Sequence, residues 1–460
     1  AGTTRLGALQ HTDGGFGWWP TDASNPAMTA LVVQSLSRLV ELDPGQGGAV
    51  AMRDRASAWL RRWWQKTRPK QGIADAALEA NVLLALSMTK GLAAKVLEDA
   101  IARSRPGFEA PLTRALLLTA AVRSNAALQA DALRTALVAT ATQQGDEAWW
   151  GTPAPRESDA RPAPTRWQDD PIEATAQVLH ALVVSGERDK ALLDRVVNWL
   201  VRQRVAGDRW RSTRDTAACV RALAAHARYV GTAFEGQVVD VALGDKPLGS
   251  ITLDRQSMFG RDEPLPLSAD VLVPGATLSV HLVSRGSPVT ASVVVRYIEE
   301  GAGIRAASNG LEITRRYWQL VEEKQNGSIT YRREQLTETV ESGALVECEL
   351  VVKSPDAREY VMVRDPHIAG FEPLRAIGRE VPGRVPVATA HLERYDDETL
   401  FFVTKLAPGT SVFRHLMRAT HVGQYTALPA QAELMYFPDL RGNGNGHPFE
   451  VRAAAEGGAR

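Results

Sequence analysis

The sequence predicts a multidomain protein whose front half is an α/α toroid and whose back half is built from β-strands. Three observations predict this: the period of the apolar residues changes near residue 231, a helical phrase repeats before that point, and tryptophan is concentrated there. Ten of the eleven tryptophans lie within the first 210 residues, and only Trp318 lies beyond them. A chain of 460 residues is long enough for about three domains of ~150 residues each.

The apolar residues of the front half recur with the period of an α-helix. In the stretch 52–63 they follow i, i+4, i+7, i+8 and i+11, and the stretches 172–183 and 192–200 show similar spacing. After Gly231 the period becomes two, so that in the stretch 346–352 every second residue is apolar. We therefore expect helices before Gly231 and strands after it.

A short phrase repeats at the start of several expected helices. It occurs as Met28-Thr29-Ala30-Leu31, as Glu173-Ala174-Thr175-Ala176 and as Asp215-Thr216-Ala217, with a weaker echo at Asp75-Ala76-Ala77. Thr175 and Thr216 are 41 positions apart, which is the length of one helical hairpin. Stacked hairpins bury their apolar faces on one another. Because the linkers are irregular, as in 151–166, we expect a closed ring and not an open solenoid.

The β half divides into a shorter and a longer series of expected strands. Residues 231 to about 305 hold short strands around a proline-rich middle, and residues 311–437 hold enough strands for a β-sandwich of about seven. We expect 438–460 to be mostly loop. Within it, the glycine and asparagine cluster 442–446 predicts a flexible turn, and 453–460 predicts a frayed terminus.

Composition excludes several classes of protein. The 53 basic and 53 acidic side chains cancel, which argues against a nucleic-acid-binding surface along the chain. Apolar residues at 44% and charged residues at 23% are typical of globular proteins. No apolar run approaches the ~18 residues of a membrane span, and the first ten residues lack the features of a secretion signal. We expect no nucleic-acid partner and no transmembrane segment in this chain.

Candidate chemistry is scarce, and we expect no catalytic, cofactor-binding or metal-binding residue and no cofactor. Asp169-Asp170 offers paired carboxylates for acid–base chemistry, but a helix cap before Pro171 is the favoured interpretation. Asp396-Asp397-Glu398 is typical of a solvated turn. Ser212-Thr213-Arg214-Asp215 has hydroxyl groups but no nearby histidine, so it does not support a nucleophile–base pair.

The histidines and cysteines do not indicate a metal site. None of the nine histidines forms an HxxxH or HxH pair: His11, His180, His226, His281, His367, His391, His415, His421 and His447. His180 and His226 fall in apolar helical stretches and are interpreted as packed ring histidines. Two cysteines are too few for a disulfide framework or a zinc site. We expect Cys219 and Cys348 to be buried small hydrophobes.

The strongest local phrase is Gln10-His11-Thr12-Asp13-Gly14-Gly15-Phe16-Gly17-Trp18. Its glycines permit a tight turn and its aromatic residues can pack back on a helix, so we interpret it as architectural. For Trp18-Trp19 and Trp149-Trp150 two interpretations remain open. They form either a rim that meets a partner or aromatic plugs within the turns of the ring.

Several phrases resemble a known family. In the front half they are Leu9-Gln10 with Asp13–Trp18, Asn25–Ala30 and Trp210–Ala217. In the back half they are Gly310–Tyr317, Tyr360–Val363, Asp365-Pro366, Ala369–Leu374, Phe401–Val403, Leu406–Thr410 and Leu428–Tyr436. In this order they resemble the C-terminal half of a bacterial alpha-2-macroglobulin-family protein, over nearly the whole chain. The resemblance implies a thioester-type toroid at 1–230, a CUB-like β segment at 231–305 and a macroglobulin-like β-sandwich at 306–460.

The resemblance also implies a function. Inhibitors of this family are not enzymes: a protease cuts an exposed bait segment, the molecule rearranges around the protease, and a Cys–Gln thioester in the toroid can acylate a lysine of the captured protease. The implied partners of this chain are target proteases. The implied location is periplasmic or secreted, and whether upstream sequence anchors the protein to the envelope is left open.

This chain departs from the family pattern at the thioester. The signature Cys-x-Glu-Gln is absent, because Cys219 begins Cys-Val-Arg-Ala and Cys348 is followed by Glu-Leu. In the family the signature precedes the region that Leu9–Trp18 resembles, so we assign no thioester residue in this chain. The resemblance therefore implies a toroid that is incomplete at its N-terminus and a CUB-like segment with open sheet edges. We expect the chain to be part of a longer protein, or to pair with a separate chain that carries the front half.

Two other functions remain as alternatives. A terpenoid cyclase-like toroid enzyme has an aspartate cluster before a helix, which Trp167-Gln168-Asp169-Asp170 resembles weakly. Against it, the Asp-x-Asp-Asp pattern is missing and the β half has no role. The related prenyltransferases need zinc ligands that the sequence does not indicate. The other alternative is a module that binds a partner through its toroid without trapping it.

Overall fold

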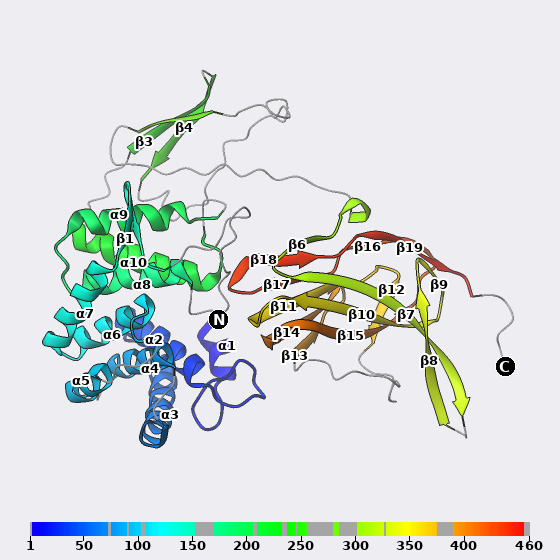
Figure 1. The fold of residues 1–460 in the computed structure, drawn as a ribbon, viewed down its shortest axis with the longest axis horizontal. Coiled ribbons are helices and arrows are strands. Elements are labelled where there is room, and N and C mark those ends of the chain that lie inside the picture. The colour runs from blue at the N-terminus through cyan, green and yellow to red at the C-terminus, as the bar shows by residue number, and fades with distance from the viewer. Residues whose placement is uncertain are drawn as a thin grey trace.

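Helices and strands occupy separate parts of the molecule. The computed structural model describes residues 2–71, 75–89, 92–102, 107–151, 170–205, 209–231, 237–244, 246–254, 279–284, 301–325, 328–374 and 390–454. The helices gather at one end and a large β-sandwich lies at the other, with a small separate sheet beside the helices (Figure 1). The helical part followed by several sheets confirms the predicted fold class.

Five helices form the inner layer of the ring. Each packs against the next in chain order: α2 (Pro26–Leu42), α4 (Ala76–Ser87), α6 (Pro111–Arg123), α8 (Pro171–Val184) and α10 (Thr213–Val230). The helices α4, α6 and α8 bury most of their residues, as expected of elements covered on several sides.

Four helices cover this layer from outside: α3 (Gly47–Gln71), α5 (Ala94–Ala102), α7 (Ala127–Ala139) and α9 (Lys190–Arg202), while the short α1 (Gly2–Ala8) buries no residue and packs against α3. The four outer helices bury narrower stripes, and α9 for example buries five residues between Leu192 and Leu200. The outer helices are therefore amphipathic, whereas the inner ones are apolar on most sides.

A repeated hydrogen bond explains the repeated threonine phrase. In three turns the backbone N–H of a buried aromatic residue donates to the hydroxyl of a threonine in the first turn of the next inner helix. The pairs are Phe16 with Thr29 at 3.0 Å, Trp150 with Thr175 at 3.0 Å and Trp210 with Thr216 at 3.1 Å. The indole N–H groups of Trp150 and Trp210 also donate to the carbonyls of Leu137 and Leu200, each at 2.8 Å. Each turn is thus closed by an aromatic residue whose polar atoms are satisfied inside the ring.

Four of the five inner helices begin at side-chain caps, and α6, which follows Ala110, has none. Asn25, Asp75 and Ser212 cap α2, α4 and α10, and Asp170 caps α8 by accepting the backbone N–H of Ile172 at 2.8 Å. Proline occupies the first helical position of α2 and α8. The capping interpretation of Asp170 is confirmed, while Asp169 lies outside the described residues.

We expected the front half to be entirely helical, but it also contains two short strands. A short hairpin, β1 (Thr142–Gln144) with β2 (Glu147–Trp149), stands between α7 and α8, and α9 packs against β2. The cause is local: Gly145 has φ of +59°, which suits a two-residue hairpin turn and stops a helix. The expectation was wrong here because tertiary contact with α9 supports strands too short to show an alternating pattern.

The small sheet follows the ring in sequence. Its strands are β3 (Gln237–Leu243), β4 (Lys246–Leu253) and β5 (Val280–Ser284), in the order β4-β3-β5. The strands are antiparallel and bury Val239 and Val241 on one face. The proline-rich middle expected between them lies outside the described residues.

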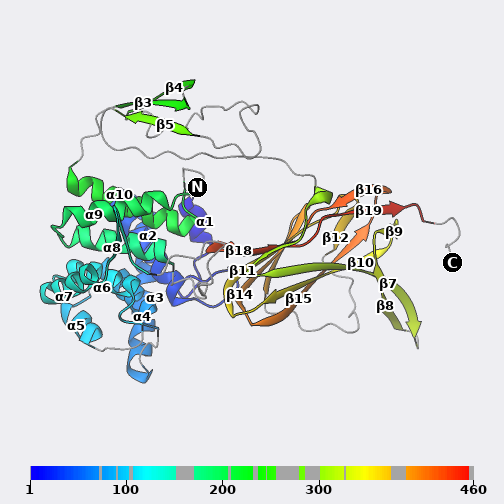
Figure 2. The ribbon, with the colours of Figure 1, turned by 45° about the horizontal axis from the view of Figure 1, so that its top comes forward.

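Two facing sheets form the terminal sandwich, which follows the 3-10 turn η4 (Gly301–Gly303) (Figure 2). The five-stranded sheet has the order β12 (Phe371–Leu374), β15 (Gly409–Ala419), β10 (Leu345–Ser354), β7 (Glu312–Gln325) and β8 (Ser328–Leu336). The six-stranded sheet has the order β13 (Ala390–Arg394), β14 (Glu398–Leu406), β11 (Arg358–Pro366), β17 (Gln431–Leu434), β18 (Phe437–Asn443) and β6 (Ala307–Asn309). A third sheet joins β16 (Gly423–Ala427), β19 (His447–Arg452) and β9 (Thr339–Glu341). The estimate of about seven strands was therefore too low, because short strands such as β6 and β9 exist only through pairing.

The expectation of loop after residue 437 was wrong for 438–454, while 455–460, part of the expected frayed terminus, lie outside the described residues. The strand β18 pairs with β17 and β6, and β19 pairs with β16 and, in parallel, with β9. The glycine cluster is also not a free turn. Gly442 lies in β18, where a Cβ would come within 2.1 Å of the Leu311 carbonyl oxygen, so close approach of two backbones requires glycine.

The repeated threonine bond makes a stability prediction. We expect Thr175→Val, which keeps the shape of the side chain but leaves the buried N–H of Trp150 without an acceptor, to destabilise the ring by about 1–3 kcal/mol. Urea unfolding followed by tryptophan fluorescence measures the loss. Thr135→Val on the exposed face of α7 is the matched control, and equal effects of the two substitutions would contradict the role of the turn bond.

Candidate functional site

The N-termini of α8 and α10 lie near one end of the sandwich, and Arg211 contacts both parts. One Nη atom of Arg211 donates to both oxygens of Asp170, at 2.9 and 3.0 Å. The other Nη lies 3.8 Å from the Asp439 carboxylate on β18, and the guanidinium lies 5.7 Å from the centre of the Phe437 ring. Arg211 is only 8% exposed, so its pair with Asp170 is largely removed from solvent, whereas Asp439 is 65% exposed and adds a weaker contact at the surface.

A second arginine makes a parallel contact. Arg214, in the first turn of α10, lies with Nη2 2.6 Å from the buried carboxylate of Glu173 in the first turn of α8. Its guanidinium lies 5.8 Å from the centre of the Tyr436 ring, in the turn between β17 and β18. We call these residues, with Asp215, the junction cluster: Asp170, Glu173, Arg211, Arg214, Asp215, Tyr436, Phe437 and Asp439.

Asp215 carries the strongest electrostatic perturbation of the junction cluster. Burial raises the pKa of Asp215 to about 8, and the neighbouring Asp170 carboxylate adds to the rise, whereas Arg211 opposes it. The Asp215 carboxylate lies 3.9 Å from the Nε of Arg211 and is 1% exposed. Burial also raises the pKa of the Tyr436 hydroxyl. The junction thus holds three buried acids against two arginines, and a proton on Asp215 balances the charge.

An aromatic contact lies beside the junction cluster. Trp19 stacks on His391 with ring centres 3.5 Å apart, and Trp18 lies 4.9 Å from Tyr360 of β11. Tyr360 in turn meets Tyr436 edge-on at 5.4 Å. The turn that begins at Gln10 therefore binds the sandwich through its last two tryptophans.

The aromatic-plug interpretation is confirmed at Trp150, whereas contact of the first tryptophan pair with a partner protein stays a prediction. Trp18 and Trp19 form a rim that meets another part of the same chain, the sandwich. Trp150 is a fully buried plug, and Trp149 stacks on Trp199 of α9 with ring centres 6.0 Å apart. The choice depends on what lies opposite each turn, which local sequence does not indicate.

Other singled-out residues take structural places. His180 is largely buried on α8, and burial lowers its pKa to about 3. His226 is buried 3.4 Å from Asp194. Cys219 and Cys348 are both free and buried, as predicted. Asp396 and Asp397 form an exposed turn, also as predicted.

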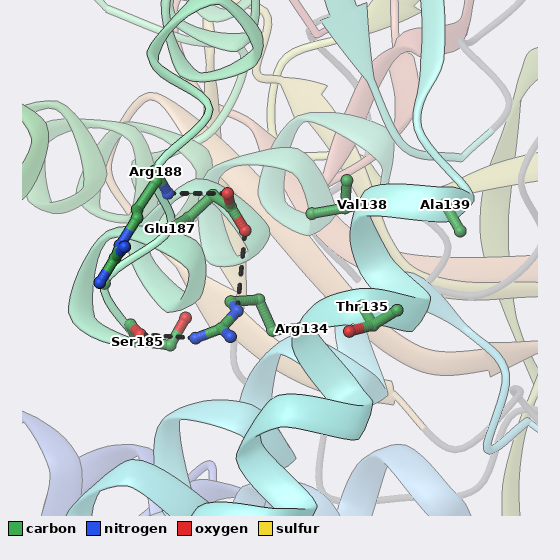
Figure 3. A pocket seen from close by; sticks show the side chains of 8 residues that line it. Arg134, Thr135, Val138, Ala139, Ser185, Glu187 and Arg188 are labelled. Atoms are coloured by element: carbon green, nitrogen blue, oxygen red, sulfur yellow. Dashed lines mark hydrogen bonds and ion pairs between the residues drawn. The ribbon is translucent and has the colours of Figure 1, made fainter.

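A hollow of about 630 Å³ opens on the outer side of the ring between α7 and the end of α8 (Figure 3). Arg134 points across it and donates to the Ser185 carbonyl at 3.0 Å, with Nε 3.7 Å from Glu187. Glu187 accepts the backbone N–H of Arg188 at 2.7 Å. Because Arg134 and Glu187 are occupied with each other and with the backbone, the hollow is not our candidate site.

Sequence reasoning did not find one further cluster. Cys348, Asp365 and His415 lie far apart in the chain, yet their ligand atoms come within 4.8 Å of one another in the sandwich core. No spacing motif connects them. The alternating pattern of 346–352 was the one available signal, because it placed Cys348 on the inward face.

Two family models match this chain. The model of the A-macroglobulin TED domain matches residues 73–226, and the model of the bacterial alpha-2-macroglobulin MG10 domain matches residues 310–439. The first range lies in the helical ring and the second in the terminal sandwich, and together they contain every residue of the junction cluster.

Solved structures with the same fold include three of bacterial alpha-2-macroglobulins, from two organisms. The Salmonella protein reacted with methylamine has a TM-score of 0.66 and 20% identity, over 97% of this chain and 27% of that chain. The native Escherichia coli protein seen by cryo-electron microscopy has a TM-score of 0.66 and 20% identity, over 98% and 27%. The Escherichia coli crystal structure from MG7 to the C-terminus has a TM-score of 0.65 and 20% identity, over 98% and 67%. This chain thus spans 27% of the length of the first two proteins.

Within the part of the chain that the structure describes, no helix combines the length and apolar character needed to cross a membrane.

The raised pKa of Asp215 predicts a pH-dependent stability. Between the ordinary pKa of 3.8 and about 8, the folded chain keeps a proton on Asp215 that the unfolded chain has released. Stability therefore falls as pH rises through this window, by up to about 1.4 kcal/mol per pH unit. We expect Asp215→Asn to flatten this slope, measured by urea unfolding from pH 5 to pH 8.5. Asp54→Asn on exposed α3 is the control, and an unchanged slope in Asp215→Asn would refute the assignment.

Proposed function

Since this chain belongs to the alpha-2-macroglobulin family and corresponds to its C-terminal region, we propose that it is the scaffold of a non-enzymatic, protease-entrapping protein. The observation that carries the proposal is the pairing of a TED ring with an MG10 sandwich in one chain, joined by the junction cluster. In this proposal the chain makes and breaks no covalent bond. Its role is mechanical: it holds the ring against the sandwich until bait cleavage elsewhere in the protein releases it.

The junction suits a contact that must hold and then open. It combines a few aromatic contacts with ion pairs, and both would regain water on separation. Ion pairs at a domain boundary contribute modest net stability, because desolvation offsets their attraction. A contact of this kind separates more readily than a continuous apolar core of the same size.

Target proteases are the proposed partners, and they would be captured by the protein as a whole. We further propose the division into a toroid at 1–230, a CUB-like segment at 231–305 and a macroglobulin-like sandwich at 306–460. The family resemblance also supports a periplasmic or secreted location. No thioester residue is assigned in this chain, because Cys219 and Cys348 lack the Cys-x-Glu-Gln context.

The acids at the junction do not favour the cyclase alternative. A cyclase acid must protonate a substrate in an open apolar cavity. Asp170 here caps α8 and is held by Arg211, and Glu173 is held by Arg214. Both carboxylates also lie under the sandwich contact.

Entrapment predicts a size-dependent inhibition. We expect the protein, expressed from its complete reading frame and mixed with an endopeptidase, to suppress cleavage of a large protein substrate while leaving cleavage of a small chromogenic peptide nearly unchanged. A trapped protease keeps a free active site but is shielded from large molecules. Equal rates of large-substrate cleavage with and without the protein would refute trapping, and equal loss of both activities would indicate an ordinary active-site inhibitor.

The junction predicts how readily ring and sandwich separate. We expect Trp19→Ala, which removes the stack on His391, to raise amide hydrogen exchange of peptides around 11–25 and 390–403 by up to about tenfold. An aromatic contact is worth ~0.5–1.5 kcal/mol. Trp149→Ala, which removes a stack inside the ring, is the matched control. If both variants change the junction peptides equally, Trp19 does not hold the junction.

A further inference from the structure

The apolar core of the terminal sandwich contains three side chains that carry metal-binding atoms. Cys348 lies on β10, His415 on β15 and Asp365 on β11. All three are at most 2% exposed. They share no residue with the junction cluster, so what they do is separate from the contact between ring and sandwich.

The sheet register places these side chains together. Cys348 and His415 are directly opposite one another in the antiparallel pair of β10 and β15, so they point to the same face. Asp365 comes from the facing sheet. Its Oδ2 accepts the Cys348 thiol at 3.1 Å and lies 2.6 Å from the Nε2 of His415. Three ligand atoms of different chemistry therefore converge from three rigid strands.

Arg315 on β7 is the charged neighbour of the Asp365 carboxylate. Its Nη1 donates to the other oxygen of Asp365, Oδ1, at 2.7 Å. This bond keeps the carboxylate ionised, and the pKa of Asp365 lies well below its usual value despite burial, because Arg315 and His415 outweigh the desolvation. Oδ1 is thus occupied, and Oδ2 is turned toward Cys348 and His415.

The cluster is not fully satisfied by its own members. The Nδ1 of His415 and the Nε and Nη2 of Arg315 are buried and have no hydrogen-bond partner among the described residues. A buried ion pair is often no more stabilising than apolar residues of the same volume. Unpaired polar atoms in a core add a further cost, so the metal-free cluster is costly to bury, although zinc on Sγ, Oδ2 and Nε2 would not itself pair these three atoms.

We propose that Cys348, Asp365 and His415 bind a zinc ion that joins the two sheets of the terminal sandwich. Thiolate, imidazole and carboxylate are the ligands that zinc takes in proteins. Zinc would bind Sγ, Oδ2 and Nε2, and Arg315 would remain on Oδ1 as the outer partner that orients the carboxylate. Three protein ligands leave one tetrahedral position for water.

Binding requires small movements and releases one proton. Ligand atoms around tetrahedral zinc lie about 3.3–3.5 Å apart, so the Nε2 and Oδ2 atoms must separate by roughly 0.7 Å. The imidazole proton moves from Nε2 to Nδ1, which leaves Nε2 free to bind. The Cys348 thiol loses its proton to solvent when the sulfur–zinc bond forms, so no oxidant or reductant is needed.

Zinc and cobalt binding to the 460-residue chain test the proposal. The chain is stripped with a chelator, dialysed against zinc and analysed for metal, and a second sample is loaded with Co²⁺. We expect one zinc per chain, a rise of roughly 5 °C in the unfolding temperature of the sandwich, and a sulfur-to-cobalt charge-transfer absorption. Cys348→Ser and His415→Gln should lose all three, while Cys219→Ser, which removes the other buried thiol, should keep them.

The wild-type spectrum decides the outcome even where a variant fails to fold. Absence of a thiolate–cobalt absorption in folded wild-type protein overturns the proposal. So does an absorption that persists in Cys348→Ser or disappears in Cys219→Ser. Zinc bound equally by wild type and by both ligand variants, without the cobalt signal, would mean adventitious surface binding, and would also overturn it.

Discussion

The buried ion pair of Arg211 with Asp170 fixes the guanidinium that the ring presents to the sandwich, where it lies 5.7 Å from the centre of the Phe437 ring and 3.8 Å from the largely exposed Asp439. Arg211 lies just before α10. It forms an ion pair with Asp170, the N-cap of α8, and its side chain extends to β18. A buried guanidinium must find carboxylates, and a buried carboxylate must find a cation or a proton. This requirement ties two inner helices of the ring to one end of the sandwich. It also explains why the acids of the ring are structural and not exposed for chemistry.

The ring solves the same packing problem several times. Each inner helix needs its orphan N–H groups satisfied and its preceding turn closed. A cap such as Asp170 does the first, and a threonine that accepts the N–H of a buried aromatic residue does the second. In the first such turn Phe16 is the buried aromatic residue that bonds to the threonine. Trp18 and Trp19, which follow it, are therefore available to contact the sandwich. The binding surface is thus an extension of an architectural turn.

The core of the sandwich contains buried polar atoms that have no hydrogen-bond partner among the described residues. Its facing sheets bury Cys348 among apolar neighbours, but the same face also carries Arg315 and His415, with Asp365 opposite. Polar side chains in a core must satisfy one another, and these do so incompletely. The junction acids are balanced by arginines and a proton, whereas the core cluster brings together a thiol, a carboxylate and an imidazole that a metal ion would join.

The sequence by itself determined the separation of helices from strands, the repeated hairpins, the cap at Asp170 and the inward face of Cys348, because these follow from local periodicity and capping chemistry. It also indicated the family, through phrases spread over nearly the whole chain. Only the tertiary structure decided that Trp19 meets His391, that 438–452 forms strands, and that Cys348, Asp365 and His415 converge. The physical reason is that each of these depends on a partner from a distant segment. Short strands such as β19 are stabilised by pairing and not by their own pattern, and a cluster drawn from three strands of two sheets leaves no spacing motif along the chain.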